Sequence, residues 1–147
     1  MPGDPTPGWQ PADYPHGTLM ALRRACVDEI GLFDESYFAY CEEAELALRA
    51  REAGWTCGLV RGARVQNVHL GSSVALVDYL QQRNTLRLVR SMSGRYHATI
   101  RLLISLGQIG AGVARPTSAP LVFDARARMI GIRDYVWGRS GPPPADL

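Results

Sequence analysis

The stretch GTLMALRRACVDEIGLFDESYFAYCEEAELALRAREAGW, residues 17–55, carries the strongest fold signals of the chain. Gly31 and Gly54 are typical helix stops, and they predict a short helix over 24–30 and a longer one over 42–53. The longer helix begins with acidic residues and ends near Arg49 and Arg51, as the helix dipole favours. A buried strand is expected over 18–23, and an aromatic loop over 32–40.

The remaining sequence predicts a mixed first half and a helical second half. Strands are expected over 56–60 and 64–69, joined by a turn at Arg61-Gly62. Apolar periodicity predicts helices over 77–92, 96–109 and 123–137, with a break at Ser93-Gly94. The fold class is therefore α/β in the broad sense, with an α+β front. We expect a proline-rich arm over 1–16, a partial domain over 17–92, and a helical extension with its tail over 93–147.

Charge is distributed unevenly over a chain whose net charge is only +2. Residues 1–78 hold 6 Arg against 11 acidic residues, whereas residues 79–147 hold 10 Arg against 3 Asp. The basic half is either a set of solvated helix faces or a surface for an anionic membrane. Nucleic acid is not expected, because the aromatic residues are not interleaved with the Arg residues as a stacking surface requires.

Cysteine content and hydropathy indicate the compartment. The three Cys residues show no CxxC spacing and fit a reducing environment better than a disulfide framework. There is no signal-peptide pattern, and the most apolar stretch, residues 102–114, is too short to cross a bilayer. We therefore expect a cytoplasmic protein, peripheral at the inner face of a membrane if the basic half binds lipid.

Candidate functional residues gather at the start of the longer helix. Glu42, Glu43 and Glu45 are either ordinary helix N-terminal acids or a group in which crowding raises a pKa towards that of a general base. His69 ends an apolar strand and is either a packed histidine or a metal ligand.

The ordered set of motifs resembles the C-terminal half of family 2 glycosyltransferases of the GT-A fold. The resemblance begins with the stretch quoted above and continues through the strand ending in His69 and the following Gly-Ser-Ser. It extends through YLQQRNTLRLVR (residues 79–90) and ARMIGIRDYVWGRSG (residues 127–141), which are similar to segments of a rhamnosyltransferase-like branch.

This resemblance implies roles for individual residues. Glu43 stands where the family has the Asp that deprotonates the acceptor hydroxyl, and Glu42 matches the preceding Glu. Asp34 and Glu35 match an acceptor-side loop, and His69 matches a ligand of the Mg or Mn ion that the intact family uses.

The resemblance also implies the reaction and the partners. It implies inverting transfer from a nucleotide-sugar to a glycan or a lipid-linked acceptor, in bacterial cell-surface polysaccharide synthesis. The family binds its donor through a preceding half with an Asp-x-Asp motif, which this chain lacks, so a companion N-terminal half is expected. The alternative is a non-catalytic fragment or accessory module that binds a glycan acceptor or a partner chain.

Overall fold

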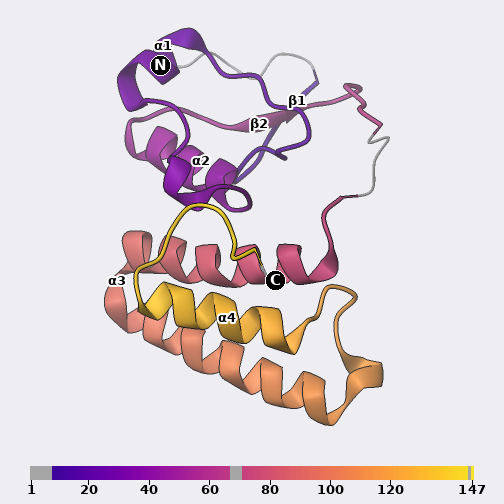
Figure 1. Cartoon of the computed structure of the whole chain (residues 1–147). Coiled ribbons are helices and arrows are strands. Elements are labelled where there is room, and N and C mark those ends of the chain that lie inside the picture. The colour runs from indigo at the N-terminus through magenta and orange to yellow at the C-terminus, as the bar shows by residue number, and fades with distance from the viewer. Residues whose placement is uncertain (1–7, 67–70, 146) are drawn as a thin grey trace. The chain divides into compact units, whose positions relative to one another are not determined.

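The computed structural model describes residues 8–66, 71–145 and 147, and it confirms the α+β class. These residues form two compact units (Figure 1). The first contains residues 8–34 and 42–66, and the second contains residues 35–41 together with the described residues from 71 onwards.

The first unit combines two short strands with two helices. Strand β1 (Trp9–Pro11) pairs antiparallel with β2 (Gly58–Val60), with Trp9 opposite Val60. Helices α1 (Arg24–Ile30) and α2 (Glu42–Glu52) confirm the helices predicted over 24–30 and 42–53. Gly31 and Gly54 end these helices with φ angles of +80° and +86°, which glycine adopts without a Cβ clash.

The strand predictions in this unit are largely wrong. Residues 18–23 form no strand, because the sheet of the described residues contains β1 and β2 alone and offers this segment no partner. The strand expected over 56–60 is confirmed only from Gly58. Its partner is β1, from the segment expected to be an arm, and not residues 64–69. Residues 64–66 are not a strand, and the rest of that prediction lies outside the described residues.

The second unit is built from helices that fold back on one another. It begins with the 3₁₀ helix η1 (Glu35–Tyr37) and continues with α3 (Val74–Ala114), the 3₁₀ helix η2 (Pro116–Ser118) and α4 (Ala125–Val136). Gly94 has φ +80° and ψ 178°, so α3 consists of two helical halves separated by a sharp kink. This confirms the predicted break at Ser93-Gly94, and α4 confirms the last predicted helix.

A hydrogen bond shows that the two halves of α3 run side by side. Gln82 donates from Nε2 to Ser105 Oγ at 2.8 Å. In an uninterrupted helix these residues would lie about 35 Å apart, at about 1.5 Å per residue. The kink at Gly94 therefore converts α3 into a helical hairpin, against which α4 packs (Figure 1).

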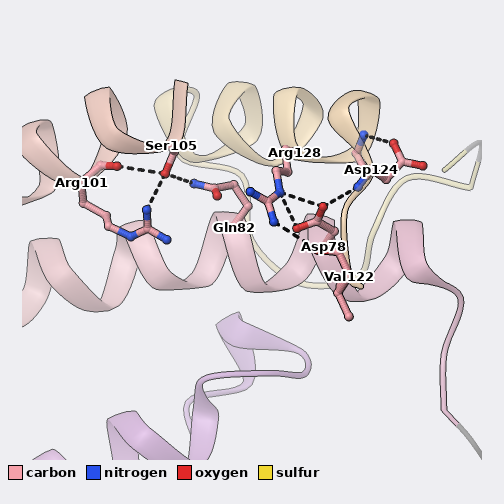
Figure 2. A network of polar contacts seen from close by, with 8 residues as sticks. Asp78, Gln82, Arg101, Ser105, Val122, Asp124 and Arg128 are labelled. Carbon is pink, nitrogen blue, oxygen red and sulfur yellow. Dashed lines mark hydrogen bonds and ion pairs between the residues drawn. The ribbon is translucent and has the colours of Figure 1, made fainter. Parts of the chain in front are cut away.

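Polar side chains form much of the interior of this hairpin. Asp78 on α3 accepts from Arg128 of α4 at 2.8 Å and from the backbone N–H of Asp124 at 2.6 Å, as Figure 2 shows. Ser105 also accepts from Arg101 at 2.9 Å. Asp78 and Ser105 are buried, so their hydrogen bonds offset a desolvation cost that apolar residues would not carry.

Across the part of the chain that the structure describes, no helix combines the length and the apolar character needed to traverse a bilayer.

Candidate functional site

Helix α2 presents three acidic residues in its first turn, and one of them has a structural partner. Glu45 accepts two hydrogen bonds from Arg49, Nε–Oε1 at 2.6 Å and Nη2–Oε2 at 2.9 Å. Arg49 also donates to the carbonyl oxygens of Ile30 and Leu32, which ties α2 to the end of α1. Glu45 therefore has a structural role, because it orients the Arg49 side chain that connects α2 to the end of α1.

Glu42 and Glu43 are arranged differently, because each has a carboxylate oxygen that accepts no hydrogen bond among the described residues. Their Oε2 atoms are buried and have no hydrogen-bond partner among the described residues. Glu43 turns its carboxylate towards Gly17, where a Cβ would lie 3.5 Å from Glu43 Oε1. Buried carboxylate oxygens without a hydrogen-bond donor are rare and costly, so these two atoms are available to accept a further hydrogen bond.

The two carboxylates also influence each other electrostatically. Burial raises the pKa of Glu42 above its ordinary value, and the neighbouring Glu43 carboxylate raises it further. A hydrogen bond from the backbone N–H of Glu42 opposes this increase in the pKa. Glu42 therefore takes up a proton more readily than an isolated glutamate.

The loop that leads into α2 has an unusual backbone. Phe38, Tyr40 and Cys41 have φ angles of +68°, +65° and +72°, in the left-handed region that residues with a side chain rarely adopt. Such strain persists only where surrounding contacts fix it, and it clusters at functional sites.

Buried residues of α3 hold this loop in place. Asn84 donates from Nδ2 to the carbonyl oxygens of Tyr37, Ala39 and Tyr40 at 2.9, 2.7 and 2.8 Å. Arg83 donates to the same Tyr37 oxygen at 3.0 Å, and both Arg83 and Asn84 are fully buried. These hydrogen bonds offset the strain of the left-handed residues.

A second layer of contacts orients Arg83. Its Nη1 donates to Tyr79 Oη at 3.1 Å, and Tyr79 donates in turn to Asp134 of α4 at 2.9 Å. Asp134 also pairs with Arg133 and Arg139. The segments YLQQRN and GIRDYVWGR, noted in the sequence only for their resemblance, thus supply the residues that support the loop.

The other candidate residues are Asp34, Glu35 and His69, and the structure describes the first two of them. Asp34 is exposed, and its charge helps Glu45 to raise the pKa of Arg49. Glu35 is exposed at the start of η1, in the second unit. His69 lies outside the described residues.

Metal binding finds no support in the described part of the chain. Residues 8–66, 71–145 and 147 contain no group of three or more His, Cys, Asp or Glu residues that could hold an ion. A cleft of about 380 Å³ in the first unit lies between the end of β1, the second half of α2 and the segment that precedes β2, and Arg51, Trp55 and Cys57 help to line it. Glu42 and Glu43 do not line this cleft.

Part of the chain is similar in sequence to two curated glycosyltransferases. Over 59 residues it is 36% identical to an N-acetylglucosaminyl-diphospho-decaprenol L-rhamnosyltransferase of Mycobacterium tuberculosis, covering 40% of this chain and 19% of that protein. Over 49 residues it is 37% identical to the low-salt glycan biosynthesis hexosyltransferase Agl10 of Haloferax volcanii, covering 33% of this chain and 16% of that protein.

These similarities are partial. The chain matches less than a fifth of the length of these curated relatives. No family model and no solved structure matches it. The comparisons therefore support a glycosyltransferase relationship at a coarse level.

Proposed function

We propose that this chain is the acceptor-side part of an inverting, family 2 type glycosyltransferase with a GT-A fold. The observation that carries the proposal is the Glu42–Glu43 pair, which keeps two buried acceptor atoms without donors. The partial similarity to two glycosyltransferases indicates glycosyl transfer as the reaction in which this pair would act. The hydroxyl group of the sugar acceptor would donate the hydrogen bond that these carboxylate oxygens lack.

In the proposed reaction, Glu43 is the general base. The acceptor hydroxyl donates its proton to the Glu43 carboxylate while its oxygen forms a bond to the anomeric carbon of the donor sugar. The bond from that carbon to the nucleoside diphosphate breaks, and the diphosphate leaves with the bonding electrons. Attack opposite the leaving group inverts the anomeric configuration, and a positioned base typically contributes about 10²–10⁴ in rate.

Glu42 assists by limiting the charge of the pair. Because its pKa is raised by burial and by Glu43, Glu42 takes up a proton more readily than an isolated glutamate. This favours a single negative charge on the pair. We propose that Asp34 and Glu35 shape the acceptor side, as the family resemblance implies.

We propose that donor binding requires a companion N-terminal half. The chain matches less than a fifth of its relatives, and the described residues offer no metal cluster. The Mg or Mn ion expected for the intact family would then be held outside the described residues, with or without His69.

The mycobacterial relative is named for a substrate in which a sugar is linked to decaprenol. We propose that this chain acts on the same class of acceptor, a lipid-linked sugar or another glycan, in cell-surface polysaccharide synthesis. A lipid-linked acceptor resides in a membrane, so the protein would work peripherally at the cytoplasmic face.

A second candidate function is a non-catalytic module that binds a glycan acceptor or a partner chain. The small share of the relatives that the chain covers favours it for the chain in isolation.

A transfer assay separates the two candidates. The chain is tested alone and with a co-expressed donor half from a related enzyme, using a panel of nucleotide-sugars and a polyprenyl-diphosphate-linked sugar. We expect product only when the donor half is present. Binding of the acceptor without product under all conditions would favour the non-catalytic module and contradict the enzyme.

A further inference from the structure

In the second half of α3, small residues are buried and large apolar residues are exposed, which reverses the usual pattern of an amphipathic helix. Ala98, Ser105 and Gly112, spaced by seven residues, are buried, and Figure 2 shows Arg101 and Ser105 on the side that faces Gln82. The side away from these residues is exposed and yet largely apolar. Tyr96 is 73% exposed, and Leu103 and Val113 are each 61% exposed.

We call this surface the outward stripe of α3. Its members are large apolar side chains that the hairpin leaves accessible to solvent: Tyr96, Ile100, Leu103, Ile104, Leu106 and Val113. Scattered exposed apolar residues are ordinary, but a row along one helix marks an interaction surface.

The charged residues of the sequence segment that contains the outward stripe are all basic. The sequence contains no Asp or Glu between Asp78 and Asp124. Arg95 precedes Tyr96, Arg115 follows Val113 by two residues, and both are exposed. Within residues 8–66 and 71–145, no carboxylate forms an ion pair with Arg95 or Arg115. A partner for the stripe should therefore be apolar in its interior and anionic at its edge.

We propose that the outward stripe of α3 docks on an anionic lipid surface. Apolar side chains of an interfacial helix enter the boundary between headgroups and acyl chains, while Arg side chains remain among the phosphates. Arg95 and Arg115 lie at opposite ends of the stripe, where they can bind headgroups as the apolar residues insert. The purpose of this docking rests on the proposed function, since a lipid-linked acceptor would be reached at a membrane.

A second copy of the chain is a poorer occupant for the stripe. Antiparallel packing of two stripes would place Arg95 of one copy near Arg115 of the other, and parallel packing would place equal residues together. Neither stripe contains a carboxylate to offset this repulsion. An anionic lipid surface supplies the opposite charge.

Vesicle binding tests the docking surface directly. The full chain is sedimented with vesicles of phosphatidylcholine alone and with vesicles containing equal parts of phosphatidylglycerol. We expect binding to the anionic vesicles that weakens as salt is added. Tyr96→Gln with Leu103→Gln should weaken binding at least roughly tenfold, because two inserted side chains are lost. Arg95→Gln with Arg115→Gln should weaken it by roughly tenfold or more.

Matched variants elsewhere control for general effects. Leu59→Gln with Val60→Gln changes two exposed apolar residues of β2, and Arg61→Gln with Arg64→Gln removes two exposed charges. Both should bind vesicles like the original chain, and circular dichroism confirms that each variant is folded. Absence of binding at low salt, or equal binding by all variants, would overturn the proposal. So would a concentration-dependent dimer that the Tyr96 and Leu103 changes abolish.

The same assay separates this proposal from the proposed function. Glu43→Gln should retain vesicle binding, because Glu43 does not belong to the outward stripe. Vesicle binding without sugar transfer would support the docking surface and count against the enzyme. Transfer to a water-soluble acceptor without vesicle binding would overturn the docking surface alone.

Discussion

A single buried amide supports the strained loop ahead of the acidic pair. The two N–H protons of Asn84 are shared among three carbonyl oxygens of residues 37–40, and Asn84 Oδ1 accepts from Arg83 at 3.0 Å. This satisfies both ends of a fully buried amide. The left-handed backbone of the loop follows from contacts with α3 and not from glycine.

Replacement of Asn84 should therefore be strongly destabilising. Asn84→Ala leaves the carbonyl oxygens of Ala39 and Tyr40, together with Arg83 Nε, without the hydrogen bonds that Asn84 provides. We expect a loss of about 2–3 kcal/mol in the free energy of unfolding. Urea denaturation measures it. Gln81→Ala, on an exposed position of the same helix, should change this free energy by less than about 0.5 kcal/mol. Equal effects of the two changes would show that Asn84 does not support the loop.

The acidic pair should give the protein a measurable pH dependence. The folded-state pKa of Glu42 is raised above 4.5, mainly by burial, so the folded chain holds this proton more tightly than the unfolded chain. The resulting stabilisation of the folded state is complete below the ordinary pKa of 4.5, and it is lost as the pH rises through the folded-state pKa. Glu42→Gln cannot titrate and should therefore gain stability relative to the original chain between about pH 4 and about pH 7.

Thermal unfolding of both proteins at the two pH values measures this gain. The difference between their unfolding midpoints should move in favour of Glu42→Gln at the higher pH. A difference that does not change with pH would indicate that Glu42 has the same pKa in the folded and unfolded chains.

At the scale of elements, close approach between helices depends on a small residue. A Cβ at Gly131 of α4 would lie 2.8 Å from the backbone oxygen of Tyr79 on α3, which cannot move aside easily. Gly131→Ala should lower the free energy of unfolding by about 1–3 kcal/mol. Gly110→Ala, with no atom within 4 Å of the new Cβ, should raise it by about 0.5–1 kcal/mol. Calorimetry that ranks the two variants in the opposite order would contradict this packing.

The ion pair between α3 and α4 provides another test at this scale. Asp78 and Arg128 have side chains only 4% and 12% exposed, and loss of one partner leaves a buried charge. Asp78→Ala should cost about 3–5 kcal/mol. Asp28→Ala removes an exposed pair with Arg24 and should cost less than about 1 kcal/mol. Similar losses of stability in the two variants would mean that the Asp78 pair is not buried in solution.

Local signals in the sequence predicted the helices, whereas non-local contacts were missed. Gly31, Gly54 and Gly94 terminate or kink helices through their own backbone freedom, so their effect is visible in the sequence. The pairing of β1 with β2 joins residues about fifty positions apart, and no local pattern specified it. The strand expected over 18–23 failed for the same reason, because a buried strand needs a neighbour that the described residues do not provide.

The candidate site was also predictable only in part. The sequence identified Glu42 and Glu43 because adjacent acids at a helix start are conspicuous. It did not predict the support from Arg83 and Asn84, because polar residues on a helix are normally assigned to the solvent-facing side. Their burial becomes reasonable only once the loop carbonyls that they bind are known.

At the scale of the whole molecule, the two units divide the proposed tasks. The first unit contains the acidic pair and the bidentate Glu45–Arg49 contact that holds its helices. The second contains the loop support and the outward stripe of α3. The chain matches less than a fifth of the length of its glycosyltransferase relatives. In the proposed function, donor binding belongs to a companion half.

The central claim is that Glu43 accepts the proton of the acceptor hydroxyl. The most direct measurement is the initial rate of sugar transfer, in the presence of the donor half, by Glu43→Gln and by Glu52→Gln at the other end of α2. We predict that Glu43→Gln lowers the rate at least about 100-fold, because an amide cannot accept the proton. Glu52→Gln should retain the original rate. A Glu43→Gln variant that transfers sugar as fast as Glu52→Gln would contradict the account.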